Sequence, residues 1–97
     1  MAKEVRWTTQ SIDTFRKVVE YLEREWSEAE GESFANITDQ TIDYISKYPL
    51  MFRETSKENV REALVTPQNF LIYKIYATHI NLILFWDTRQ SPRKKKY

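Results

Sequence analysis

Two apolar runs near the end of the chain constrain its fold most. Residues 70–76 read FLIYKIY and residues 80–86 read INLILFW, and aliphatic and aromatic side chains of this kind suit a pleated sheet. In both runs the apolar residues occupy both alternating faces, which is typical of strands covered on both sides. We therefore expect two strands in the middle of a sheet, with a turn near Ala77-Thr78-His79 between them.

A third strand is expected just before these runs. Residues 59–65 place Arg61, Ala63 and Val65 on one face and the intervening residues on the other. The segment Thr66-Pro67-Gln68-Asn69 is rich in turn-forming residues, so it should reverse the chain into the next strand. The three strands then form an antiparallel meander.

The first half of the chain reads as a short strand followed by two helices. Residues 5–7 can form the strand, and apolar residues then recur at spacings of three and four. The two stripes are Ile12, Phe15, Val19, Leu22 and Trp26, and then Phe34, Ile37, Thr41, Ile45 and Tyr48. Ser27 with Glu30 has the spacing of a capping box that starts the second helix, and Pro49 stops it.

This order predicts one α+β domain over residues 1–97, with a basic tail at 88–97. Helices grouped before a strand meander favour a helical hairpin packed on a twisted antiparallel sheet of three to five strands. Residues 51–52 are a candidate for an additional short strand. Neither helix can bury its apolar stripe alone, so both should lie on the sheet.

Composition excludes several kinds of site. The chain has no cysteine, one histidine and one glycine, so disulfides, thiolate metal sites and a glycine-rich phosphate loop are excluded. We expect neither a metal nor another cofactor. No apolar run reaches the roughly 20 residues of a membrane helix, and the first residues lack the apolar core of a signal peptide. The cytoplasm is therefore the expected location.

The charge is distributed unevenly along the chain. Residues 1–58 carry eight Lys+Arg and twelve Asp+Glu, a net charge of −4, whereas residues 59–97 carry seven and two, a net charge of +5. The basic half contains the expected sheet and tail. This polarity indicates either an anionic partner for one face or a solvated tail that keeps the protein soluble.

Several cations are candidates for binding a phosphate backbone. Arg61 and Lys74 lie inside expected strands, and Arg89 follows the end of another. Antiparallel pairing could bring them to one side of the sheet, beside aromatic residues that could stack on bases. The remaining candidates are Arg93, Lys94, Lys95 and Lys96. Alternatively, Arg61 pairs with Glu62 or Asp87 and the aromatics belong to the core. His79, at a turn, is expected to be solvated.

The chain resembles toxins of the RelE/ParE superfamily, the toxin halves of bacterial type II toxin–antitoxin pairs, often called plasmid stabilisation proteins. The resemblance rests on 69–75 and on 80–92, in which FWDTRQSP is the most specific piece. It also includes Trp7-Thr8, YLEREWS at 21–27 and ISKYP at 45–49. It spans about Lys3 to Arg93. The resemblance implies the hairpin-on-sheet fold and a cognate antitoxin as partner.

The resemblance also implies two different activities. The RelE branch cleaves mRNA on the ribosome as a metal-independent RNase, and the ParE branch poisons DNA gyrase without a nuclease site. For cleavage, Arg61 and Arg89 would stabilise the phosphate and Tyr97 would stand for a terminal tyrosine. RNA would be bound by Lys74 and by Arg93, Lys94, Lys95 and Lys96. Leu71 stands where RelE has an arginine, which favours the ParE branch.

We therefore expect a growth-inhibiting toxin that cleaves mRNA on the ribosome. The alternatives are a non-catalytic inhibitor of DNA gyrase and an inactive member that only binds its antitoxin. The antitoxin is expected to fill an apolar groove between the helices and the sheet edge with a helix or a strand.

Overall fold

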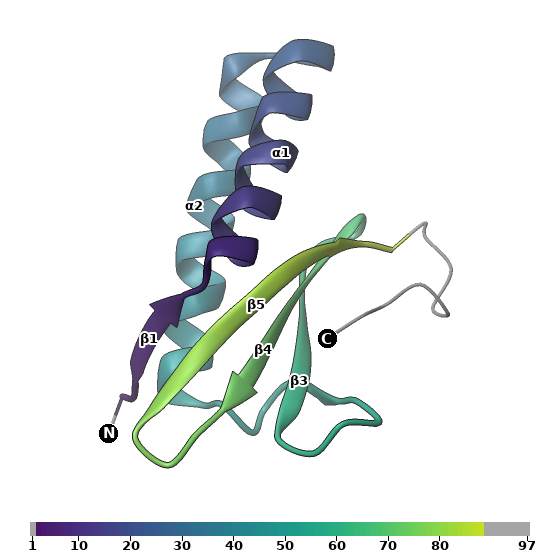
Figure 1. Ribbon diagram of the computed structural model, residues 1–97. Coiled ribbons are helices and arrows are strands. Elements are labelled where there is room, and N and C mark those ends of the chain that lie inside the picture. Colours follow the sequence, from purple (N-terminus) through teal and green to yellow (C-terminus); the bar gives the residue numbers. More distant parts are fainter. Residues whose placement is uncertain (1, 89–97) are drawn as a thin grey trace.

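The computed structural model describes residues 2–88, which fold as two helices packed on one sheet (Figure 1). The order of elements along the chain agrees with the expected α+β class. The elements are β1 (Glu4–Trp7), α1 (Thr9–Glu25), α2 (Glu28–Lys47), β2 (Arg53–Glu54), β3 (Val60–Thr66), β4 (Asn69–Ile75) and β5 (His79–Asp87). The extra short strand therefore begins at Arg53 and not at residues 51–52.

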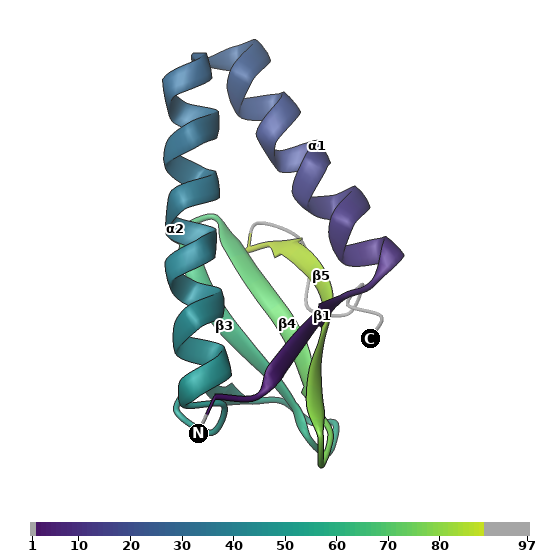
Figure 2. The ribbon, with the colours of Figure 1, turned by 90° about the vertical axis from the view of Figure 1, so that its left-hand side faces the viewer.

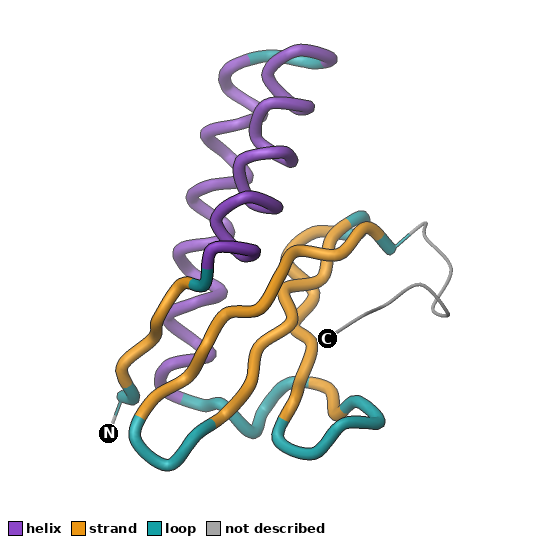
Figure 3. The backbone as a smooth tube through the Cα atoms, viewed as in Figure 1, coloured by secondary structure: helices purple, strands orange, loops and turns teal. Residues whose placement is uncertain are grey.

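The sheet has five strands in the order β1-β5-β4-β3-β2. β4 is central and β5 is also flanked on both sides, so the expectation for the two apolar runs is confirmed. β2, β3, β4 and β5 are antiparallel neighbours. β1 is different, because it pairs with β5 in parallel, with Val5 opposite Ile80. Both helices lie in the connection that leads from β1 to the rest of the sheet (Figure 3).

The helices cover one face of the sheet (Figure 2). The core on this side contains Phe34 and Ile45 from α2 together with residues from β3, β4 and β5. The buried strand residues of this core are Ala63, Val65, Leu71, Tyr73, Ile80, Leu82 and Phe85. A separate cluster of Val60, Ile72 and Leu84 lies on the opposite side, which we call the helix-free face. Both faces of β4 are thus apolar, as its sequence requires.

A reciprocal hydrogen-bond pattern starts α1. Thr8 Oγ1 accepts from the Ser11 backbone N–H at 3.1 Å, and the Thr8 N–H donates to Ser11 Oγ at 2.9 Å. Thr8 Oγ1 also donates to the Leu82 carbonyl at 2.7 Å, which fixes the start of the helix to β5. Ser27 caps α2 by accepting from the Glu30 N–H at 3.2 Å, but the Ser27 N–H donates to the Leu22 carbonyl, so only half of the expected capping box forms.

The helical hairpin projects beyond the sheet as an arm (Figures 1 and 2). α2 has 20 residues and is about 30 Å long, whereas the seven residues of β4 span only about 23 Å. The apolar stripe of α1 is therefore only partly covered. Ile12 is 41% exposed and Trp26 is 72% exposed, so the expectation that the whole stripe lies on the sheet is wrong at both ends.

Candidate functional site

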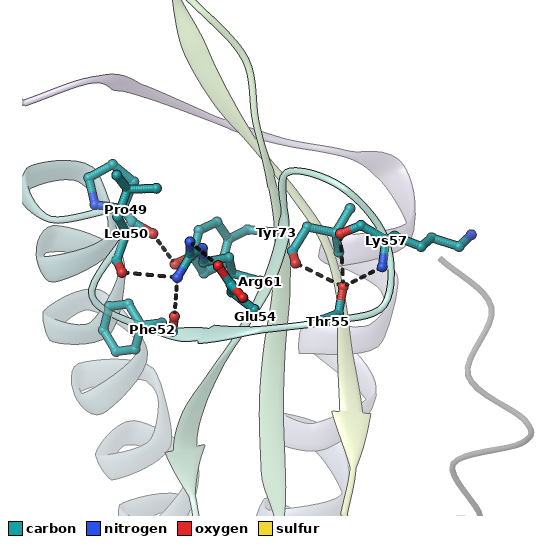
Figure 4. A network of polar contacts seen from close by, with 9 residues as sticks. Pro49, Leu50, Phe52, Glu54, Thr55, Lys57, Arg61 and Tyr73 are labelled. Carbon is teal, nitrogen blue, oxygen red and sulfur yellow. Dashed lines mark hydrogen bonds and ion pairs between the residues drawn. The ribbon is translucent and has the colours of Figure 1, made fainter.

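Arg61 is held on the helix-covered side of the sheet, at the connector between α2 and β2 (Figure 4). Its Nη1 donates to the Leu50 carbonyl at 3.0 Å and to the Phe52 carbonyl at 2.8 Å. Its Nη2 lies 3.1 Å from Glu54 Oε1. The side chain of Arg61 is 17% exposed and that of Glu54 is 78% exposed. The guanidinium is therefore used to bind the connector, and the acid it pairs with is neither Glu62 nor Asp87.

Tyr73 supports the same connector from the neighbouring strand (Figure 4). It lies opposite Arg61 in the β3–β4 register, and its hydroxyl donates to the Pro49 carbonyl at 2.6 Å. Its ring meets Phe52 edge to face, with 6.3 Å between the ring centroids. Burial raises the pKa of the Tyr73 phenol well above its ordinary value, and the nearby Arg61 only partly opposes this rise. The phenol stays neutral and donates a hydrogen bond.

Arg61 and Lys74 point to opposite sides of the sheet. Arg61 pairs with Tyr73, whose side chain is in the helix-side core, and Lys74 pairs with Val60 on the helix-free face. The expectation that antiparallel pairing brings these two cations together is therefore wrong. The cause is an irregularity between Leu64 and Thr66, where the register shifts by one residue. Such a shift moves every β3 residue on the far side of the irregularity, Arg61 included, to the neighbouring partner on β4.

The other residues predicted for the site lie outside the described residues. They are Arg89, Tyr97, Arg93, Lys94, Lys95 and Lys96. His79 is described, and it is the first residue of β5 and half-buried, not solvated in the turn as expected. Of the predicted cations, the structure therefore places Lys74 on the helix-free face and Arg61 on the other.

The helix-free face also carries a buried acid. Glu62 is only 5% exposed and lies opposite Ile72 of β4 and Arg53 of β2. Arg53 Nε lies 3.5 Å from Glu62 Oε1, and the arginine side chain is 73% exposed. The ion pair with Arg53 offsets part of the cost of burying this side chain. The sequence gives little sign of this pair, because β2 has only two residues and no periodicity of its own.

A groove of about 960 Å³ lies between the arm and the end of the sheet where β4 begins and β5 ends. α1 and α2 form one wall, and Asn69, Phe85 and Asp87 contribute to the other. The apolar side chains of the helical wall are Val18, Tyr21, Leu22, Trp26, Phe34 and Ile37. The rim carries Lys17 and Glu30. The groove follows from the incomplete covering of the α1 stripe. The sequence indicates such a groove only through the lengths of its elements, because the expected helices are much longer than the expected strands.

No group of three or more His, Asp or Glu side chains within residues 2–88 could hold a metal ion. Neither described helix is long and apolar enough to cross a membrane.

Among known proteins, similarity to this chain is found in structure but not in sequence. No protein-family model matches the sequence, and no curated protein matches it. The structure is similar to a chain of the chromosomal ParDE TA system from P. aeruginosa, with a TM-score of 0.77 and 7% identity. That match covers 89% of this chain and 96% of the other.

Two further solved structures have the same fold. One is the YoeB dimer from Staphylococcus aureus, with a TM-score of 0.64, 7% identity and coverage of 93% of this chain and 100% of the other. The second is the DinJ-YafQ toxin-antitoxin complex from E. coli, with a TM-score of 0.60 and 14% identity. It covers 90% of this chain and 93% of the other. The chain thus has the fold of RelE/ParE-type toxins, which confirms the fold expected from the sequence.

Proposed function

We propose that this protein is the growth-inhibiting toxin of a toxin–antitoxin pair and that its antitoxin binds in the groove beside the arm. The observation that supports this most is the groove itself, in a chain that shares its fold with structures from toxin–antitoxin systems. Tyr21 and Trp26 are exposed beside the half-buried Leu22, and neighbouring apolar side chains of this kind mark a surface that a partner covers. A fold alone does not define a function, whereas a groove lined by apolar side chains is the kind of surface that binds a partner.

The chemistry of the groove defines the segment that would fill it. Its helical wall is apolar along successive turns of α1, from Val18 to Trp26, and this favours a partner helix or strand with one apolar face. Lys17 and Glu30 at the rim offer opposite charges for polar positions of that segment. Tyr21 and Trp26, at 42% and 72% exposure, are the side chains that would gain most buried area.

The first route that we propose for growth inhibition is cleavage of mRNA on the ribosome. It is supported by Lys74 on the helix-free face and by five cations with no acid among residues 89–97. In this route Arg89 stabilises the charge that builds on the phosphate, and Tyr97 moves a proton. Lys74, Arg93, Lys94, Lys95 and Lys96 bind the RNA backbone. Arg61 could bind phosphate directly only by giving up its hydrogen bonds to two carbonyls.

A second route is binding and inhibition of DNA gyrase without cleavage, and the position of Arg61 favours it. Leu71, which replaces an arginine of RelE in the resemblance, is fully buried in the helix-side core. A site that cleaves RNA in this chain would therefore have no arginine at the position of Leu71. Arg61 would reach a phosphate only by leaving the carbonyls of Leu50 and Phe52. A supercoiling assay with purified gyrase separates the routes. Unchanged supercoiling at saturating protein removes this second route.

Induction of the protein in growing bacteria tests the toxin role itself. We expect arrest of growth, and recovery when the cognate antitoxin is produced with it. A chain that can be produced freely without any antitoxin is not a toxin and, at most, binds one. The test requires no assumption about the molecular target, so its result stands whichever route operates.

A further inference from the structure

A second group of polar and aromatic side chains lies where β4 turns into β5, at the opposite end of β5 from Asp87. We call it the hairpin-end patch and define it as Arg6, Lys74, Tyr76, His79 and Asn81. Ile75 and Ile80 point into the helix-side core, so the residues that alternate with them on β4 and β5 point to the helix-free face. None of these residues takes part in the groove.

The strand register aligns the patch across three strands. Lys74 of β4 lies opposite Asn81 of β5, and Asn81 lies opposite Arg6 of β1. Arg6 shares the helix-free face because its neighbours point the other way: Val5 packs on the helix-side core and Trp7 stacks on Phe85. A lysine, an amide and an arginine thus form one cross-strand row.

The next row toward the turn is aromatic. The rings of Tyr76 and His79 stack with 4.8 Å between their centroids and 15° between their planes. A hydrogen bond of 2.8 Å from the Tyr76 N–H to the His79 carbonyl fixes the two residues opposite one another. Tyr76 is 39% exposed and His79 is half-buried, so the pair is partly open to solvent. Lys74 Nζ lies over the Tyr76 ring, 5.3 Å from its centroid, so a base that stacks on this ring takes the place of the cation, which is then free to meet the adjoining phosphate.

The charge around these rings is positive. Lys3 adds a third cation, because its Nζ donates to the Tyr76 carbonyl at 2.7 Å. Glu4 is an acid beside the row, where it lies opposite His79 and bonds to Arg6 at 3.2 Å. The side chains of Glu4 and Arg6 are 62% and 52% exposed, and exposed pairs of this kind contribute little. Arg6 can therefore exchange Glu4 for another anion at small cost.

We propose that the hairpin-end patch binds single-stranded nucleic acid, with one base stacked on the Tyr76–His79 pair and the adjoining phosphates at Lys74 and Arg6. Cations beside an exposed aromatic surface are the combination that binds single strands through backbone and base stacking. Asn81, between the two cations, can donate its amide N–H to a phosphate oxygen. The patch shares Lys74 with the mRNA route proposed above but does not depend on that route: no 2′-hydroxyl is required, so DNA binds as well as RNA, and no cleavage is involved.

Fluorescence anisotropy of the 97-residue protein with a labelled oligothymidylate of about twelve nucleotides tests this proposal. Tyr76→Ala should weaken binding at least about fivefold, and Tyr76→Phe, which keeps the ring, should bind as the parent does. An oligonucleotide with the same phosphates but no bases should bind the parent more weakly and should not distinguish it from Tyr76→Ala. Unchanged far-UV circular dichroism shows that each variant is folded.

Lys74→Ala and Lys47→Ala form a matched pair, because each removes one positive charge but Lys47 lies on α2 in an ion pair with Asp43. Lys74→Ala should lower the slope of log affinity against log salt by about 0.7, the value for one phosphate on a single strand, and Lys47→Ala should leave it unchanged. Equal effects of the two lysines would overturn the proposal. So would equal binding of the parent and Tyr76→Ala, or equal binding of polyglutamate, which would indicate an acidic protein segment as the ligand.

Discussion

Arg61 on β3 lies directly opposite Tyr73 on β4, and both side chains bond to carbonyl groups of the connector that follows α2. Arg61 binds the carbonyls of Leu50 and Phe52, and Tyr73 binds that of Pro49. The pair thus fixes the connector to the helix-covered side of the sheet. Because Arg61 is bound to the connector on this side, it is separated from Lys74 on the helix-free face, which is open to an anionic partner.

Arg61→Ala should therefore lower the free energy of unfolding by about 2 kcal/mol, because hydrogen bonds to a charged group are lost and two carbonyls lose their donor. Arg61→Lys should recover only part of this loss, since an ammonium group cannot reproduce the fork of the guanidinium. Chemical denaturation measures both. Arg16→Ala, which removes an exposed arginine of α1, is the control and should cost no more than about 0.5 kcal/mol. A fully stable Arg61→Ala protein that is no longer toxic would instead assign Arg61 to the functional site.

Tyr73→Phe should lower stability by about 1 kcal/mol near neutral pH, because it removes the hydrogen bond to Pro49. The pKa of this phenol is raised from its ordinary value of 10.0 in the folded state. Above pH 10 the unfolded chain loses the proton and the folded chain keeps it, so stability falls as pH rises, by up to about 1.4 kcal/mol per pH unit. The stability of the parent should therefore approach that of Tyr73→Phe above pH 10. A difference that stays constant with pH would contradict this account.

Thr8→Ala should lower the free energy of unfolding by about 1 to 2 kcal/mol, because it removes the cap of α1 and the hydrogen bond to the Leu82 carbonyl. Thr9→Ala, at the next and exposed position, is the matched control and should change stability by no more than about 0.5 kcal/mol. Thermal unfolding followed by circular dichroism compares the two variants. Equal midpoints would show that the Thr8 side chain does not secure the arm.

Trp26→Ala should weaken binding of the antitoxin at least about tenfold, because Trp26 is the most exposed aromatic side chain of the groove. Its effect on folding should be small for the same reason. Tyr44→Ala is the control, since Tyr44 is 52% exposed and does not line the groove. Cells that produce antitoxin together with Trp26→Ala toxin should fail to recover, and cells with Tyr44→Ala should recover. Recovery in both would place the antitoxin elsewhere.

The sequence was sufficient to predict the elements and their order, because apolar periodicity and turn residues are local signals. It was not sufficient for the pairing of β1 with β5, which joins segments more than seventy residues apart. The position of Lys74 was missed for a related reason. The Thr66–Asn69 register, continued without a shift, would set Arg61 opposite Lys74, and one bulge sets it opposite Tyr73.

Packing between the helices explains Gly31, a residue that is unfavourable in a helix by propensity alone. A glycine in the first turn of α2 costs about 1 kcal/mol relative to alanine. In the structure it is buried where the two helices approach each other. A Cβ there would lie 2.9 Å from Cγ of Glu23 and 3.5 Å from Cγ1 of Val19, so the short distance between α1 and α2 leaves little room for a larger residue. Periodicity identified the helices but not this approach.

Mapping of mRNA ends by primer extension, after a short pulse of the protein in growing cells, tests the central claim most directly. The parent protein is compared with Arg89→Ala. We predict growth arrest with new breaks inside translated codons, and loss of those breaks in the variant. Arrest with intact mRNA would contradict the cleavage route and favour gyrase as the target. Normal growth with intact mRNA would contradict the toxin role itself.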